Sequence, residues 1–432
     1  MRQKLLHEGA KELSYEIREI VKKANILQKE GLEISWENIG DPIQKNAQIP
    51  DWIKLIIQDL AGQDESYGYC DSKGIPETRE FLAKVNNALG GAQINADDIL
   101  FFNGLGDAIS TLYHYLDTTS RVIGPSPAYS THSSAEAAHA NHQPLTYRLD
   151  PANNWYPDMD DLRNKVEFNP NVVAILLINP DNPTGMVYPK DILDEIVELA
   201  KEFDLMLISD EIYHHITYNG ARAYALSEVI DEVPGIAMKG ISKELPWPGA
   251  RCGWIECYNR DKNSDFDQLC NALDDAKMIE VCSTTLPQMA IPKILGDSRY
   301  IDYRNELNEK IGWRSRFIAE TLSEIPELRF NETYGAFYNT IVFKQGVLNA
   351  DQTLPIENPA IRKQVESWVE NVSLDFRFVY YLLGATGICV VPISSFCSDL
   401  LGFRVTLLEE DEELFKKTFL QLRDSIRYYL DS

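Results

Sequence analysis

The sequence has few cysteines for its length, and none of them form a C-x-x-C pair. Its seven cysteines are spread over 432 residues, from Cys70 to Cys397. An odd, scattered set argues against a disulfide framework and against a zinc site. We therefore expect no bound metal and a reducing, cytoplasmic setting.

Long apolar runs are missing too, as are internal repeats and low-complexity linkers. The first 23 residues, MRQKLLHEGAKELSYEIREIVKK, lack the apolar centre of a signal peptide and have the pattern of a charged amphipathic helix. Nowhere is an uncharged apolar run long enough to span a bilayer. The sequence therefore predicts no membrane segment.

Basic residues are the minority among the charged ones. There are 41 Lys and Arg against 66 Asp and Glu, a formal net charge of −25. Such a balance repels nucleic-acid backbones and anionic lipids, so we expect neither as a partner. The composition, 44% hydrophobic and 25% charged, is otherwise that of a globular protein.

The order of helical and strand patterns predicts an α/β fold. From about residue 74, helices alternate with strands that are apolar throughout, such as NVVAILLI and LMLIS. Such strands belong in a mainly parallel sheet with helices on both faces. After about residue 298, a long charged helix, short strands and a final helix indicate a smaller α+β domain. We predict a large domain over residues 50–297 and a small domain from residues 1–49 and 298–432.

Polar motifs follow the predicted strands, where open α/β sheets bind ligands. NPDNPTG, from Asn179 to Gly185, forms a rigid turn that would hold the Asn182 amide at a fixed depth; a stiff loop without function is the alternative. In SDEIYHH, Asp210 ends a strand and Tyr213 follows three residues later. Asp210 could hold a protonated ring nitrogen or merely cap a helix. The two histidines after Tyr213 are interpreted as structural.

Two cations follow the next predicted strand, in KGISKELPWPGARCGW. A partly desolvated Lys243 near another cation would be a usable amine nucleophile. Arg251 has the fork geometry for phosphate or carboxylate. The alternative is an exposed lysine and a structural arginine.

A glycine turn and a tyrosine complete the set. NGLGDAI would present backbone N–H groups to a phosphate at a helix start, although Ile109 breaks the dinucleotide fingerprint. In GPSPAYS, Tyr129 could stack on a planar ligand or simply pack on the surface.

Together these motifs resemble the fold-type I aminotransferases that use pyridoxal 5′-phosphate, class I/II, the group that includes aspartate aminotransferases. NPDNPTG, SDEIY and GISK…PGARCGW recur at the family's separations, and the resemblance covers Glu33 to Leu408. It implies a large domain with a mainly parallel, seven-stranded type of sheet and a smaller α+β domain. It also implies transfer of the α-amino group of an L-amino acid to a 2-oxo acid.

The resemblance implies a role for each matching position. Lys243 would form a Schiff base with the cofactor, and Asp210 and Tyr213 would act with it in catalysis. Tyr69, before Gly74, matches a tyrosine that reaches the partner's phosphate across a homodimer. The implied cofactor-binding residues are Tyr69, Leu105, Gly106, Tyr129, Asn182, Asp210, Tyr213, Ser242, Lys243 and Arg251. The implied substrate-binding residues are Gly40, Asn182 and Arg404, with Arg404 clamping the α-carboxylate.

The chain departs from the family pattern in three places. Gly240 replaces a serine that usually binds the phosphate, Trp247 is bulky, and the loop over residues 345–373 is long. A lyase, a decarboxylase or an aminocyclopropane-carboxylate synthase of the same fold would keep every cofactor residue. A non-catalytic or regulatory protein is the remaining alternative; the negative charge and the presence of Lys243 and Asp210 count against it.

Overall fold

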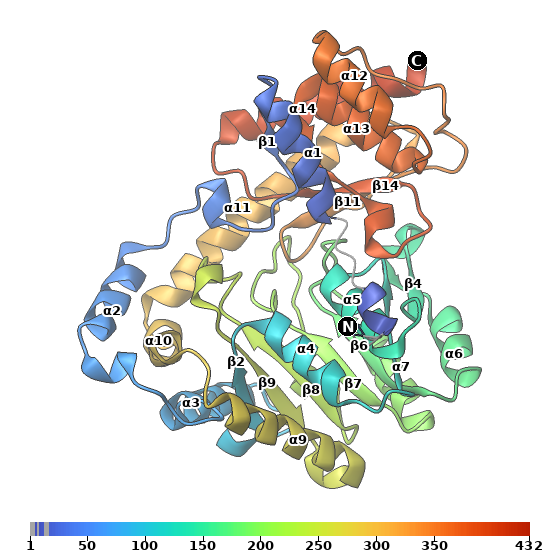
Figure 1. The fold of residues 1–432 in the computed structure, drawn as a ribbon. Coiled ribbons are helices and arrows are strands. Elements are labelled where there is room, and N and C mark those ends of the chain that lie inside the picture. The colour runs from blue at the N-terminus through green and yellow to red at the C-terminus, as the bar shows by residue number, and fades with distance from the viewer. Residues whose placement is uncertain (1–4, 7, 13–16) are drawn as a thin grey trace.

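The structure is a computed structural model that describes residues 5–6, 8–12 and 17–432. Figure 1 shows a larger unit around a central sheet and a smaller unit against one end of it. Among the described residues, every helix is too short or too polar to cross a lipid bilayer.

The larger unit is built on an eight-stranded sheet. In spatial order its strands are β2 (Ile99–Phe102), β9 (Gly253–Tyr258), β8 (Gly235–Gly240), β7 (Met206–Asp210), β6 (Val172–Ile178), β3 (Arg121–Ser126), β4 (Thr146–Asp150) and β5 (Tyr156–Pro157). β9 is antiparallel to both neighbours and β5 is antiparallel to β4, while the other pairs are parallel. The sheet thus has the expected mainly parallel strands plus β5. At two residues, β5 is too short to leave a periodic signal in the sequence.

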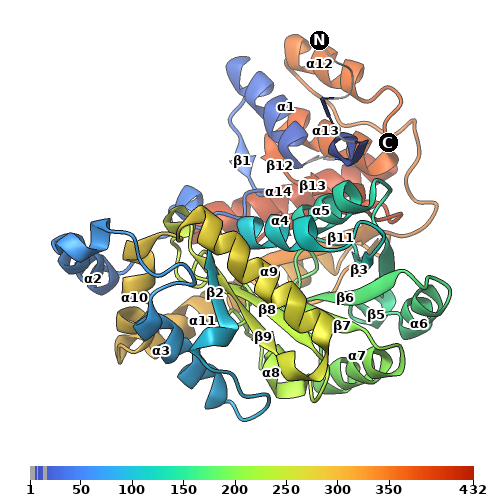
Figure 2. The ribbon, with the colours of Figure 1, turned by 60° about the horizontal axis from the view of Figure 1, so that its bottom comes forward.

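Helices cover both faces of this sheet, as Figure 2 shows. They are α3 (Pro76–Asn87), α4 (Leu105–Tyr115), α5 (Ser130–Ala140), α6 (Met159–Glu167), α7 (Lys190–Glu202), α8 (Leu226–Val229), α9 (Ser264–Glu280) and α10 (Thr285–Leu295). Side chains alternate along β6: Ile175 and Leu177 pack in the core with α6 and α7, whereas Ala174 and Leu176 pack with α4 and α9. Burial on both faces explains why the strand is apolar throughout.

The smaller unit has its own antiparallel sheet and core. Its strands are β10 (Leu328–Arg329), β11 (Tyr338–Phe343), β14 (Gly402–Thr406) and β13 (Val391–Pro392), in that spatial order. Its helices are α12 (Pro359–Trp368), α13 (Leu374–Thr386) and α14 (Glu412–Asp431), and the long α11 (Arg299–Leu322) leads into it. α2 (Asp51–Ala61) lies apart from it, beside α10 (Figure 1).

The N-terminal segment packs with these C-terminal elements. Figure 1 shows α1 (Ile17–Lys29), in blue, against the orange helices. β1 (Ser35–Trp36) pairs in parallel with β12 (Ile388–Cys389), and Thr406 donates its N–H to Glu37 O at 2.9 Å. The pairing agrees with a small domain made from both chain ends, although the domain boundaries themselves stay a prediction.

Two local predictions differ from the structure. The expected N-terminal helix falls partly on residues 1–4, 7 and 13–16, which lie outside the described residues. Its last part, from Ile17, is helical in α1, whereas Glu8–Lys11 form a short 3-10 helix. One of the short strands expected in the smaller domain, ICVVP over residues 388–392, is divided into β12 and β13, which pair with different partners. Periodicity within one segment cannot reveal such a change of partner.

The topology brings the predicted site residues to one edge. Strands β2, β3, β6, β7 and β8 all end there, because they run in the same direction. The antiparallel β9 begins there, so Arg251, two residues before it, lies at the same edge. Ligands of open α/β sheets bind beyond this edge.

Candidate active site

A cavity of about 510 Å³ lies at the carboxyl edge of the sheet, closed on one side by the smaller unit. Its size is in the usual range for a small-molecule site. Every predicted site residue except Tyr69 lines it: Gly40, Leu105, Gly106, Tyr129, Asn182, Asp210, Tyr213, Ser242, Lys243, Arg251 and Arg404. Residues separated by more than 300 positions thus meet at one place.

One end of the cavity is built to hold an anion. α4 begins at Leu105, directly after Gly104, whose φ is +86°. A Cβ on Gly106 would meet no atom within 4 Å, so the first turn of the helix is open. Arg251 lies against it and donates from Nη2 to Asn103 O at 3.3 Å. A helix N-terminus beside a guanidinium group is a suitable site for a phosphate.

A buried carboxylate lies on the floor of the cavity. Asp210 is 3% exposed, and its Oδ1 accepts the Ile212 N–H at 3.1 Å. Its Oδ2 lies 3.0 Å from Nε2 of His132, which is 1% exposed. The sequence analysis missed His132. The available signal was its position one helical turn after Tyr129, at the start of α5.

The amine of Lys243 points into the same cavity. Its Nζ donates to Gly40 O at 2.8 Å, so the glycine turn of the N-terminal segment lies directly over it. A Cβ on Gly40 would come within 2.2 Å of the Tyr338 hydroxyl, which explains the glycine. The nucleophile and the substrate-side turn therefore touch, although they come from different units.

Arg404 enters the cavity from β14 and is 3% exposed. Its Nη2 donates to Asn38 O at 2.7 Å, and its Nη1 donates to Asn182 Oδ1 at 3.3 Å. The guanidinium carbon lies 4.4 Å from the centre of the Tyr338 ring. Stacking and hydrogen bonds fix the plane of the Arg404 guanidinium group, as recognition of a carboxylate requires.

Tyr213 and Tyr338 form a buried hydroxyl pair. Their oxygens lie 3.1 Å apart. Burial raises the pKa of the Tyr213 phenol well above its ordinary value, and the neighbouring Tyr338 raises it further. Tyr213 therefore stays a neutral hydroxyl near neutral pH. Tyr338 was missed because it comes from β11, far from every motif.

The NPDNPTG turn is held by one of its own side chains and by one from β11. The Asp181 carboxylate accepts the Thr184 N–H at 3.0 Å, and Thr340 donates to Pro183 O at 2.8 Å. The turn is therefore a rigid loop and also places Asn182 in the cavity. The two interpretations of this motif are compatible.

The packing around Gly240 and Trp247 explains part of the way in which the chain departs from the family pattern. A Cβ on Gly240 would lie 3.1 Å from both Cys252 O and Ile212 Cδ1, so a serine would be crowded here. Ser242 lines the cavity, whereas Trp247 packs against the core of the larger unit and does not line it. Tyr69 is 86% exposed and lies outside the cavity.

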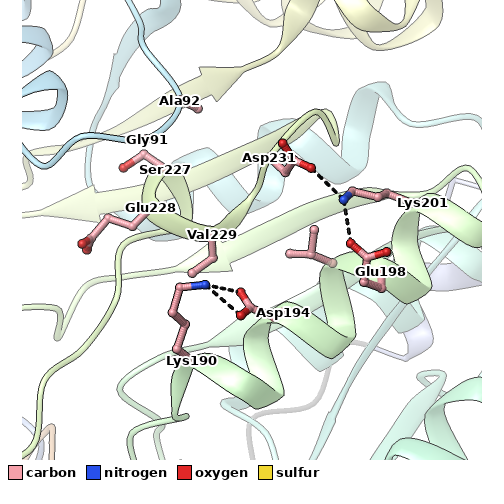
Figure 3. A pocket seen from close by; sticks show the side chains of 11 residues that line it. Gly91, Ala92, Lys190, Asp194, Glu198, Lys201, Ser227, Glu228, Val229 and Asp231 are labelled. Carbon is pink, nitrogen blue, oxygen red and sulfur yellow. Dashed lines mark hydrogen bonds and ion pairs between the residues drawn. The ribbon is translucent and has the colours of Figure 1, made fainter.

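A second cavity, of about 590 Å³, lies between α7 and α8 (Figure 3). It contains none of the predicted site residues. Its lysines are already paired, Lys190 with Asp194 at 2.6 Å and Lys201 with Asp231 at 2.7 Å. Within the described ranges, no cluster of His, Cys, Asp and Glu is arranged to hold a metal ion.

Residues 38–415 match the family model for aminotransferase class I and II. The chain belongs to this family. An uncharacterized aminotransferase of Methanocaldococcus jannaschii is 55% identical over 430 residues, all of both chains. The glutamate-pyruvate aminotransferase of Escherichia coli is 29% identical over 75% of this chain and 79% of its own. The solved alanine aminotransferase of Pyrococcus furiosus has a TM-score of 0.83 at 28% identity, covering 98% of this chain and 99% of that one.

Membership confirms the resemblance seen in the motifs. This aminotransferase is a pyridoxal-phosphate-dependent transaminase that acts on amino acids and 2-oxo acids. The cavity fits the cofactor, because an anion site, a buried carboxylate and a lysine amine face one space large enough for it. When bound, pyridoxal phosphate draws electrons from the substrate's α-carbon and carries the amino group between substrates.

Proposed function

We propose that the transaminase reaction takes place in the cavity around Lys243, with the residues divided into three groups. Leu105, Gly106, Ser242 and Arg251 hold the phosphate. Tyr129, Asn182, Asp210 and Tyr213 hold the cofactor ring. Gly40, Asn182 and Arg404 bind the amino acid. The observation that carries this proposal is the convergence of Lys243, Asp210, Arg251 and Arg404 on one cavity.

The side chains of the site act on defined atoms. Asp210, buried and paired with His132, keeps a proton on the ring nitrogen. The neutral Tyr213 donates its hydroxyl hydrogen to the ring's 3-oxygen. Arg404 orients the substrate by its α-carboxylate, and the amine of Lys243 moves the proton at the α-carbon.

Peptide mapping tests the assignment of Lys243. After borohydride reduction of the holoenzyme, we expect a pyridoxyl group on the peptide that contains Lys243. Lys239 is the internal control, because it lies four residues away but is paired with Glu256 at 2.7 Å. A pyridoxyl group on another lysine, or none, would overturn the proposal.

We further propose that alanine and pyruvate are substrates. Among the described residues that line the cavity, the cationic side chains are Lys243, Arg251 and Arg404. The cofactor and the α-carboxylate of the substrate engage all three cations. None is left to pair with an acidic side chain of the substrate, so a small uncharged side chain is favoured. The name of the Pyrococcus furiosus relative, alanine aminotransferase, supports the same choice, whereas the name of the Escherichia coli relative includes glutamate as well as pyruvate.

A donor panel tests the substrate. With the purified holoenzyme and a 2-oxo acid, we expect alanine to give the highest kcat/KM among L-amino acids, with pyruvate as the product. Preference for aspartate would contradict the small-substrate proposal. Release of ammonia or carbon dioxide in place of a new amino acid would favour a lyase or a decarboxylase.

The exposed Tyr69 supports a homodimer with shared sites. A tyrosine that is 86% exposed on the loop before α3 is suited to contact a second copy of the chain. Hybrid dimers of Tyr69→Ala and Lys243→Ala chains test this arrangement. One site per hybrid would then combine an intact Lys243 with the partner's intact tyrosine, and we expect tight cofactor binding in half of the sites. A monomer in sedimentation would contradict it.

We propose the cytoplasm as the location, because none of the described cysteines forms a disulfide, as expected in a reducing compartment. Fractionation of cells that express the native gene would test this.

A further inference from the structure

Lys277 is a buried cation that the proposed chemistry does not use. It lies on α9, its side chain is 1% exposed, and it does not line the cavity. Its Nζ lies 3.5 Å from Asp107 Oδ2, forms an ion pair with Glu280, and sits 4.9 Å from the centre of the Phe102 ring. A lysine buried this far is retained only with charged partners, and here it has two.

Asp107 and Glu280, the two partners of Lys277, both accept hydrogen bonds from Asn103. Asp107 Oδ2 accepts the Asn103 N–H at 2.9 Å, and Glu280 accepts a hydrogen bond from the Asn103 side-chain amide. The carbonyl of Asn103 in turn accepts from Arg251 Nη2 at 3.3 Å. Asn103 is thus held at its N–H, its side chain and its carbonyl, immediately before the turn that opens α4.

The charges in this cluster would oppose a bound phosphate without Lys277. Asp107 lies in the first turn of α4, where a carboxylate competes with any other anion for the positive helix end. Glu280 adds a second negative charge. Together, the side chains of Asp107, Glu280 and Lys277 carry a formal charge of −1. Without Lys277, the two carboxylates carry −2.

We propose that Lys277 is a positioning residue for the cofactor phosphate. It holds Asp107 and Glu280 so that Leu105, Gly106 and Arg251 present their N–H groups to the phosphate, and it offsets the negative charge behind them. The inference rests on the proposed placement of the phosphate at this turn.

Cofactor affinity with and without a phosphate tests this role. Pyridoxal 5′-phosphate and pyridoxal are titrated spectroscopically into the apoenzyme of each variant. For Lys277→Met we expect binding of the phosphorylated form to weaken by about tenfold and binding of pyridoxal by less than about twofold. Lys277→Arg should restore most of the loss. Lys201→Met, on the surface of α7, is the control and should behave as wild type.

The possible outcomes distinguish an error in the role of Lys277 from an error in the proposed placement of the phosphate. If the wild type binds pyridoxal as tightly as pyridoxal 5′-phosphate, the placement of the phosphate is wrong. If the wild type discriminates between the two and Lys277→Met discriminates equally well, the role of Lys277 is wrong. Should Lys277→Met fail to fold, Lys277→Gln removes the positive charge while keeping a hydrogen-bond donor at the same place. A loss of about threefold for the phosphorylated form alone is then expected, and no loss overturns the inference.

Discussion

His132 and Asp210 form a buried pair beneath the cavity, with Nε2 of the imidazole 3.0 Å from Oδ2 of the carboxylate. The two residues come from different helix–strand units, α5 and β7. A carboxylate buried to this degree is costly unless it is hydrogen-bonded, and the histidine supplies such a bond and fixes the position of the carboxylate.

His132→Phe should lower kcat by about 10- to 100-fold, because Asp210 loses a charge-assisted hydrogen bond while the ring volume is kept. Steady-state kinetics per mole of bound cofactor measures this. The pH dependence of the cofactor absorbance should shift as well, which a purely structural residue would not cause. His114→Phe, on the exposed face of α4, is the control. An unchanged kcat would contradict the role of His132.

Gly104→Ala should weaken cofactor binding by about tenfold, because a Cβ would lie 2.4 Å from Arg251 Nη2 and displace the guanidinium group. Gly90→Ala is a matched control: its φ is +88° against +86°, and a Cβ there meets no atom within 4 Å. Both variants should also lose about 1–3 kcal/mol of stability, because an L side chain is strained at a positive φ. Equal cofactor affinities in the two variants would refute the prediction.

Arg404→Ala should raise KM for every amino donor by about 10- to 100-fold, the loss expected for a charge-assisted pair. Cofactor affinity should not change, since Arg404 contacts the substrate end. Arg314→Ala is the comparison, because Arg314 is also buried in the smaller unit, with Glu410 at 3.2 Å, yet lies outside the cavity. If the two variants raise KM equally, the carboxylate clamp is elsewhere.

Asp181→Asn should make stability less sensitive to pH. Burial raises the pKa of Asp181 to about 7, although its hydrogen bonds from Thr184 oppose the shift. The folded protein therefore holds this proton more tightly than the unfolded chain, whose ordinary value is about 4. The stability that the proton confers is present below about pH 4 and lost as the pH rises to about 7.

Urea unfolding of the wild type and of Asp181→Asn between about pH 5 and 8 measures this effect. The wild type should lose up to about 1.4 kcal/mol per pH unit relative to the variant, and the difference should level off above about pH 7. Asp160→Asn, on the exposed first turn of α6, is the surface control. A difference that does not vary with pH would contradict the raised pKa.

The residues that the sequence predicted share one property. Asp210, Lys243 and Asn182 each follow an apolar strand within a short window, so a local pattern marks both the element and the side chain beyond it. Arg251 belongs to the same class, since it precedes an antiparallel strand at the same edge. The mainly parallel character of the sheet follows from the same alternation of strands and helices.

The residues that were missed come from other segments. His132 contacts Asp210 from a helix, and Tyr338 reaches Tyr213 from the smaller unit. The spacing from Tyr129 was a local signal for His132 itself, but nothing local indicates either contact. Lys277 was missed for the same reason, because only the packing of α9 against α4 brings it to Asp107. Long-range packing, which no periodicity encodes, decides these positions.

The roof of the cavity comes from both ends of the chain, with Gly40 and Asn38 on one side and Arg404 on the other. During synthesis, the residues of the floor, through Arg251, leave the ribosome well before β14 does. Arg404, the proposed substrate clamp, is therefore translated last of the described lining residues. The cavity can close only when translation has nearly finished.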